Sequence, residues 1–181
     1  MKYIIRLSLL ATALIFVMGF TPAEKPQAKV NWISIEEAVT LAEKDGKKIL
    51  VDMYTDWCGW CKRMDATTYR NEEVINYINE HYHAVKFDGE YKGEIEIKGR
   101  TFKFVPSGRR GYHELAASLM QGKMSYPTTV FLDENIQLLT SVPGYQQAPQ
   151  LMPILAYFGE NAYITQDWNS FSTGYKTRSG K

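Results

Sequence analysis

Two cysteines separated by two residues, Cys58 and Cys61, directly follow a short apolar run that favours a β-strand. The run covers Ile49 to Tyr54, and the residues that begin at Cys58 have the pattern of a helix. Strand, turn and helix in this order place Cys58 at a helix N-terminus, where unpaired backbone N–H groups and the helix dipole favour a thiolate. Because the thiolate is the attacking species in disulfide exchange, we expect Cys58 to attack and Cys61 to resolve the mixed disulfide. The pattern therefore predicts dithiol redox chemistry.

The residues alone leave two other uses of the cysteine pair open. One is a structural disulfide, although so short a loop constrains the unfolded chain very little. The other is a zinc site, which needs four ligands, and the chain offers only His81, His83 and His113 besides the two cysteines. The spacing of His81 and His83 does not match the usual zinc-finger patterns. We favour redox chemistry, with no metal and no other cofactor.

The segment around the cysteines resembles the active-site segment of thioredoxin-fold proteins. Trp57-Cys58-Gly59-Trp60-Cys61-Lys62 is close to the bacterial thioredoxin-like branch that includes exported disulfide reductases. A second segment, Ser125-Tyr126-Pro127-Thr128-Thr129-Val130-Phe131-Leu132-Asp133, is similar to the second signature of the family, in which a cis-proline faces the dithiol. The resemblance covers Asn31 to Tyr145 and implies an α/β fold with a central mixed β-sheet and helices on both faces.

The resemblance also implies roles for residues outside the cysteine pair. Asp52 matches the buried acid of the family, which takes up and returns the proton of the inner thiol. Burial would raise the pKa of Asp52, and the alternative is an ordinary carboxylate at a solvated strand end. Gly144 matches a family glycine near the dithiol, where a side chain would crowd the substrate. We expect the substrate groove to be framed by Trp57, Trp60, Tyr126, Pro127 and Gly144.

The first residues have the pattern of a secretory signal. Lys2 and Arg6 precede an uncharged run from Leu7 to Phe20, and small residues follow as far as Ala23. This pattern predicts a signal peptide over residues 1–23. The run is shorter than the roughly 20 residues that span a bilayer, and an uncleaved membrane anchor is the alternative. Either way, we expect the folded part to be exported to the periplasm.

Composition bounds the partners and the number of domains. The formal net charge is +1, and it becomes slightly negative without Lys2 and Arg6, which argues against a nucleic-acid partner. Two cysteines are too few to staple an exported scaffold, so we expect the pair to react. We expect a monomer with a linker at residues 24–30, a thioredoxin-like domain at 31–160 that contains an inserted β-hairpin at 89–105, and an aromatic-rich C-terminal tail at 161–181. The tail is expected to pack on the body, with a docking segment as the alternative. The hairpin would either shape a substrate surface or cover a sheet edge.

The remaining pattern predicts alternating helices and strands. Ser34 is a good N-cap with Glu37 three residues later, and Asp45-Gly46 should end this first helix. Asn71 restarts or continues the helix that opens at Cys58. Further helices are expected over residues 113–120 and 151–158, and strands over 81–88, 128–132 and 136–141.

These features together predict a thiol-disulfide oxidoreductase that acts on protein disulfides outside the cytoplasm. We expect the reducing direction because Gly59-Trp60 supplies no positive charge between the cysteines to hold a thiolate. An exported reductant must itself be reduced through the membrane, so a membrane electron-transfer protein is the expected donor. The alternatives are a non-catalytic binding or chaperone-like module on the same fold, and a metal carrier that uses the two cysteines.

Overall fold

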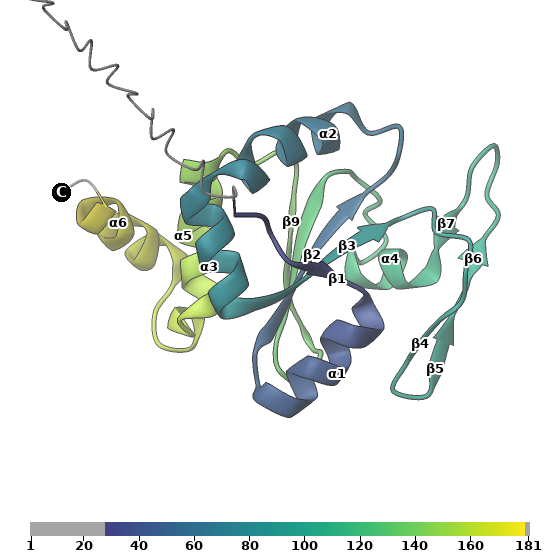
Figure 1. Cartoon of the computed structure of the whole chain (residues 1–181), viewed down its shortest axis with the longest axis horizontal. Coiled ribbons are helices and arrows are strands. Elements are labelled where there is room, and N and C mark those ends of the chain that lie inside the picture. The colour runs from purple at the N-terminus through teal and green to yellow at the C-terminus, as the bar shows by residue number, and fades with distance from the viewer. Residues whose placement is uncertain (1–27, 180–181) are drawn as a thin grey trace, which may run out of the picture.

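The computed structural model describes residues 28–179 of the chain, so the expected signal peptide and most of the expected linker lie outside the described residues. A five-stranded mixed sheet in the order β1-β3-β2-β8-β9 forms its centre (Figure 1). Three strands are parallel to one another: β1 (Trp32–Ile33), β3 (Tyr82–Asp88) and β2 (Lys48–Tyr54). β8 (Thr128–Leu132) runs antiparallel to β2, and β9 (Leu138–Pro143) runs antiparallel to β8.

Helices cover both faces of this sheet (Figure 1). One face carries α1 (Ile35–Asp45) and α4 (Glu114–Leu119) over a core that includes the apolar side chains of both helices. The other face carries α2 (Gly59–Ala66), α3 (Glu72–His81) and α5 (Ala148–Gly159) over a second core. The expected α/β architecture with a central mixed sheet and helices on both faces is therefore confirmed.

The alternation of β2 decides where Asp52 points. Val51 and Met53 pack in the core beneath α1 and α4, whereas Leu50 packs in the core beneath α2, α3 and α5. Successive side chains of a strand point to opposite faces of the sheet. Asp52 therefore shares a face with Leu50 and lies beneath the helix that begins at the cysteines.

Capping residues set the helix boundaries that position the site. The Ser34 side chain accepts the N–H of Glu37 at 3.1 Å, and Gly46 ends α1 with a left-handed φ of 75°. Asn71 caps α3 in the same way as Ser34 caps α1. α2 and α3 are therefore separate helices, joined by the short 3-10 turn η1 (Thr68–Arg70).

The segment between β3 and α4 differs from the expected hairpin at 89–105. A hairpin is present as β4 (Ile95–Ile97) and β5 (Arg100–Phe102), but a second antiparallel pair follows it, β6 (Phe104–Val105) and β7 (Tyr112–His113). The N–H of His113 donates to the carbonyl of Gly89 at 2.8 Å, which closes the whole segment on itself. We call residues 89–113 the excursion. His113 was expected to begin a helix, but it ends β7 and caps α4 by accepting the N–H of Leu115.

Two further boundaries differ from expectation for local reasons. His81 was expected in a strand, but it is the last residue of α3. β9 begins at Leu138 rather than Ile136, because the Asp133 side chain accepts the N–H groups of Asn135 and Gln137 and lengthens the turn.

The C-terminal segment is helical rather than an irregular tail. It forms η2 (Ala162–Ile164) and α6 (Trp168–Ser179), and α6 lies beside α5 at the edge of the molecule (Figure 1). Phe171 is buried in a cluster with Tyr157 of α5. The segment therefore packs on the body as expected, although its helical form was not predicted, because Ser, Thr and Gly residues give it a weak intrinsic preference for helix.

None of the helices described here is long and apolar enough to cross a membrane.

Candidate active site

Cys58 and Cys61 form a disulfide at the start of α2, with their Cα atoms 5.3 Å apart. Cys58 is the N-cap of α2, and its Sγ accepts the backbone N–H of Cys61 at 3.0 Å. In the reduced protein this N–H group and the positive end of the helix would stabilise a Cys58 thiolate. Cys58 is 5% exposed and Cys61 is 2% exposed. The expected position of Cys58 at a helix N-terminus is therefore confirmed, and both sulfurs are largely covered in the disulfide form.

The second predicted motif lies at the same end of the sheet as the cysteines. The peptide bond between Tyr126 and Pro127 is cis. Thr128, the next residue, begins β8 and pairs with Met53 near the end of β2. The loop that carries Cys58 begins at this same end of β2. Pro127 and Cys58 therefore lie at the same end of the central sheet.

Gly144 joins this edge through the backbone. Its N–H donates to the carbonyl of Pro127 at 2.8 Å, and its φ of 92° is in the region that favours glycine. A Cβ atom on Gly144 would meet nothing within 4 Å. Backbone conformation therefore accounts for this glycine in the structure, and its expected role in leaving room for a substrate stays a prediction.

Exposed aromatic side chains surround the dithiol. Trp57 is 52% exposed and Trp60 is 59% exposed, although they flank buried cysteines. The ring of Trp57 packs edge-on against Tyr126 with a centroid distance of 6.0 Å. The ring of Trp60 packs against Tyr145 at 5.4 Å, a contact that the sequence did not predict. Their expected role in framing a substrate groove stays a prediction.

The excursion contacts the tryptophan that precedes the first cysteine. The Trp57 Nε1–H donates to Glu90 Oε1 at 3.0 Å, and the Arg110 guanidinium lies 4.2 Å from the Trp57 ring centroid. Arg110 Nη1 also lies 3.9 Å from Glu90 Oε1. Both residues were missed from the sequence, because no local pattern links residues 90 and 110 to residue 57. The excursion therefore forms part of the rim of the site.

Asp52 is buried beneath α2, at 1% exposure, which contradicts the solvated strand-end alternative. Its Oδ2 lies 3.4 Å from Lys86 Nζ, and the same ammonium group also pairs with Asp65. Burial raises the pKa of Asp52 to about 6, while Lys86 opposes this rise. A carboxyl group with a pKa near neutrality can both accept and return a proton at physiological pH. The proton-transfer role of Asp52 stays a prediction, with a burial and a pKa that suit it.

Two buried hydroxyl groups belong to the core that contains Asp52. Thr129 is directly opposite Asp52 in the β2–β8 register and is 0% exposed. Tyr69, from η1, is buried in the core beneath α2 and α3. Asp52 Oδ1, Tyr69 OH and Thr129 Oγ1 each have no hydrogen-bond partner within the described part of the chain. Sequence patterns gave no signal for Tyr69, and Thr129 was quoted only as part of the proline motif.

The histidines of the metal alternative lie apart from the cysteines. His81 stacks on Tyr77 at a centroid distance of 4.2 Å, and His83 Nε2 bonds to Asp45 at 3.0 Å. Across residues 28–179, no group of three or more His, Cys, Asp or Glu side chains is arranged to hold a metal ion. The alternative in which His81 and His83 face one metal with the cysteines thus finds no such set of ligands among the described residues.

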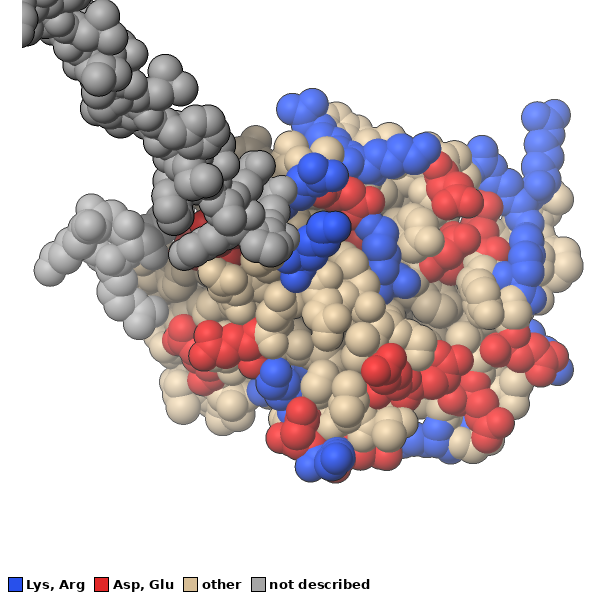
Figure 2. Space-filling view, viewed as in Figure 1, with Lys and Arg blue, Asp and Glu red and all other residues tan. Residues whose placement is uncertain are grey.

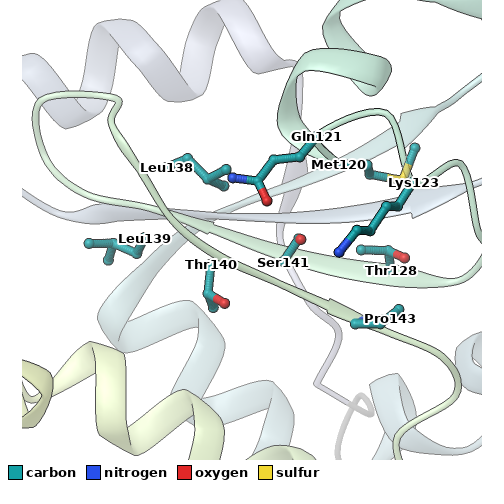
Figure 3. A pocket seen from close by; sticks show the side chains of 9 residues that line it. All are labelled: Met120, Gln121, Lys123, Thr128, Leu138, Leu139, Thr140, Ser141 and Pro143. Atoms are coloured by element: carbon teal, nitrogen blue, oxygen red, sulfur yellow. The ribbon is translucent and has the colours of Figure 1, made fainter.

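Two surface features lie outside the dithiol. A hollow of ≈ 260 Å³ runs along β9 beside the end of α4, and neither cysteine lines it (Figure 3). Basic side chains gather over α2 along the upper edge of the space-filling view, with acidic side chains next to them (Figure 2). The visible face thus carries both signs of charge rather than one extended field.

Comparison with known proteins places this geometry in a family. Residues 22–168 match Thioredox_DsbH, which is described as a protein of unknown function, DUF255. The chain belongs to this family. The match covers most of the chain and includes both cysteines and the proline motif. The expected membership of a thioredoxin-like family is therefore confirmed.

Several curated proteins are similar in sequence to all or part of this chain. An uncharacterized protein of Haemophilus influenzae is 27% identical over 152 residues, which cover 76% of this chain and 92% of that protein. Spermatogenesis-associated protein 20 of Rattus norvegicus is 29% identical over 77 residues, 42% of this chain and only 10% of that protein. Thiol:disulfide interchange protein DsbD of Pseudoalteromonas atlantica is 31% identical over 65 residues, 35% of this chain and 11% of that protein. The chain thus spans about a tenth of the last two relatives.

Solved structures show the thioredoxin fold. A DsbH oxidoreductase superimposes with a TM-score of 0.53 and 20% identity, over 76% of this chain and 90% of that chain. A putative disulphide-isomerase from Bacteroides thetaiotaomicron gives a TM-score of 0.53 and 23% identity, over 78% of this chain and 98% of that chain. The chain therefore has the thioredoxin fold.

Proposed function

We propose that the protein reduces disulfides of other proteins outside the cytoplasm and is itself reduced by a membrane electron-transfer protein. The observation that carries this proposal is the N-cap position of Cys58, whose Sγ accepts the N–H of Cys61 above a buried Asp52. One sulfur is thereby placed to become a thiolate at a helix N-terminus, while a titratable acid lies beneath the same helix.

The proposed reaction transfers two electrons in two exchange steps. The Cys58 thiolate attacks one sulfur of the substrate disulfide, that bond breaks, and the other substrate sulfur leaves as a thiolate that takes a proton from water. Cys61 then gives its proton to Asp52 and attacks the Cys58 sulfur of the mixed disulfide. The second substrate sulfur leaves as a thiolate and takes the proton back from Asp52, so that it is released as a thiol. The protein is left with the Cys58–Cys61 disulfide and an ionised Asp52. A dithiol donor reverses these steps and restores the reduced protein.

Two observations support the direction and the partners. Apart from the disulfide bond, the contact recorded at Cys58 Sγ is a backbone N–H, and Gly59-Trp60 adds no cation between the cysteines. Relatives named as thiol:disulfide interchange proteins support exchange with other thiol proteins. The signal pattern in residues 1–23 supports the location outside the cytoplasm.

Turnover of a protein disulfide tests the proposal. We expect the reduced protein to accelerate the reduction of insulin by dithiothreitol, because Cys58 reacts faster than a free small thiol. Cys58→Ser should abolish this acceleration, and Cys61→Ser should accumulate a mixed disulfide that mass spectrometry locates at Cys58. Ser141→Ala, a change in the edge strand β9, is the control and should keep full activity. If the wild-type protein does not accelerate reduction, or Cys58→Ser remains active, the proposed function is wrong.

A further inference from the structure

Three polar side chains meet in the apolar core beneath α2. Thr129 and Asp52 are direct cross-strand neighbours, so their side chains point to the same face of the sheet. Tyr69 enters the same core from η1, directly after α2, and its ring packs edge-on against Trp32 at 5.0 Å. Strand pairing and a helix end thus bring together residues that lie far apart in the sequence.

Each of these side chains has an oxygen that no other described group satisfies. Asp52 directs Oδ2 towards Lys86, whereas Oδ1, Tyr69 OH and Thr129 Oγ1 make no well-formed hydrogen bond in residues 28–179. Tyr69 nevertheless lies close enough to Asp52 and Thr129 for each to affect its pKa. A buried polar atom without a partner costs free energy, so such atoms occur where a function or a change of state uses them. Asp52 changes its charge when it accepts and returns a proton, and a new negative charge requires additional donors.

Hydroxyl groups are suitable donors for that charge. Burial and the negative charge of Asp52 raise the pKa of Tyr69 well above its usual range, so the phenol keeps its proton at every pH at which the protein works. Both hydroxyl groups face the core beneath α2, and Thr129 opposes part of the rise in the pKa of Tyr69. Tyr69 can therefore donate to Asp52 while it accepts from Thr129.

We propose that Tyr69 is a positioning residue that, supported by Thr129, hydrogen-bonds the ionised carboxylate of Asp52 and so governs proton uptake from Cys61. This inference rests on the proposed function for its catalytic consequence, and the hydroxyl pair itself can be tested without it. No covalent step is added, because Tyr69 and Thr129 keep their protons throughout.

The charged neighbours of Asp52 do not replace the interaction that we assign to Tyr69. Lys86 on β3 faces Asp52, but it also pairs with Asp65 on α2 and lies 5.1 Å from the ring centroid of Tyr54. Asp65 acts in the opposite direction to Lys86 and raises the pKa of Asp52. Among the described residues, the Lys86 ammonium group is thus shared with a second carboxylate, whereas the Tyr69 hydroxyl interacts with Asp52 and Thr129.

The experiment compares Tyr69→Phe with Tyr77→Phe. The Tyr77 hydroxyl is also buried without a hydrogen-bond partner, but Glu160, beyond the active-site face, dominates its charged surroundings, so Tyr77→Phe is a matched control. Carbon-13 NMR of the Asp52 carboxyl group in the disulfide form follows its titration directly. We expect the Asp52 midpoint to rise by about half to one pH unit in Tyr69→Phe, the amount that a single neutral hydrogen bond supplies. Tyr77→Phe should leave it unchanged.

A kinetic measurement links the titration to the reaction. The rate at which Cys61 resolves a mixed disulfide at Cys58 should show the same upward shift of its pH profile in Tyr69→Phe, with an unchanged rate of first attack. Thr129→Val should shift the profile in the same direction, and Thr129→Ser should restore it. An unchanged Asp52 titration in Tyr69→Phe would overturn the inference. If the titration shifts while the wild-type protein fails to reduce disulfides, the proposed function fails and the hydroxyl pair stands.

Discussion

At the scale of single residues, the cost of holding Asp52 in the core should appear in the stability of the protein. The pKa of Asp52 is about 6 in the folded chain, above its ordinary value of 3.8. The protonated form therefore stabilises the fold below pH ~4, and this contribution is lost as the pH rises through ~6. We expect Asp52→Asn in the disulfide form to gain stability relative to wild type as the pH rises from 4 to 8, by at most about 3 kcal/mol. Urea unfolding at several pH values measures this difference.

The control for this prediction is Asp56→Asn, which changes an exposed carboxylate beside the same site. Because the Asp56 side chain is exposed, the stability difference of Asp56→Asn from wild type should change with pH by much less than that of Asp52→Asn. A constant difference for Asp52→Asn would mean that Asp52 titrates as an ordinary surface acid, in conflict with its burial.

The same residues show what the sequence could predict. The position of Cys58 at a helix N-terminus followed from a local pattern, because strand, turn and helix signals act over a few residues. The burial of Asp52 was expected from the resemblance to thioredoxin-fold proteins, with a solvated strand end as the alternative. Lys86, Tyr69 and Thr129 were not assigned to the site, because the pairing of β2 with β3 and β8 and the turn after α2 bring them to Asp52. Such contacts depend on the assembled sheet and leave no signal in the spacing of residues.

At the scale of elements, the excursion is the main departure from the predicted fold. The hairpin at its start was predicted from alternating apolar residues, but the second strand pair and the return to Trp57 were not. We expect Arg110→Ala to release the Trp57 ring and to lower kcat/KM for a protein disulfide by about two- to fivefold, the effect of losing one exposed cation–π contact. Stopped-flow kinetics with insulin and with a small aromatic disulfide measure this effect, and the small disulfide should react at the wild-type rate.

Arg109→Ala is the matched control, because it removes the same charge one residue earlier, at another exposed position. It should leave both rates unchanged. Equal losses for the two arginine variants would assign the effect to net charge rather than to the contact with Trp57.

At the scale of the whole molecule, the fold does not determine whether the protein reduces or oxidises other proteins. The reduction potential of the dithiol determines this direction. Thioredoxin has a potential near −270 mV and a strongly oxidising relative one near −120 mV, so the two roles differ by about 7 kcal/mol for two electrons. We expect this protein to lie nearer −270 mV, because its cysteine pair encloses Gly59-Trp60 and no cation. Equilibration with glutathione buffers, followed by thiol alkylation, measures the potential. A value near −120 mV would reverse the proposed direction while leaving Cys58 as the attacking residue.

The different positions of the two cysteines on α2 also limit the order in which partner proteins can react. Cys58 is the N-cap of α2 and Cys61 lies within the helix, so under the proposed function both the electron donor and the client protein would form their mixed disulfide with Cys58. Because Cys58 forms one mixed disulfide at a time, a donor and a client would not be attached to it covalently together. Under the proposed function, electrons therefore pass in a double-displacement cycle, in which the donor reacts with the disulfide form and the client reacts with the dithiol form.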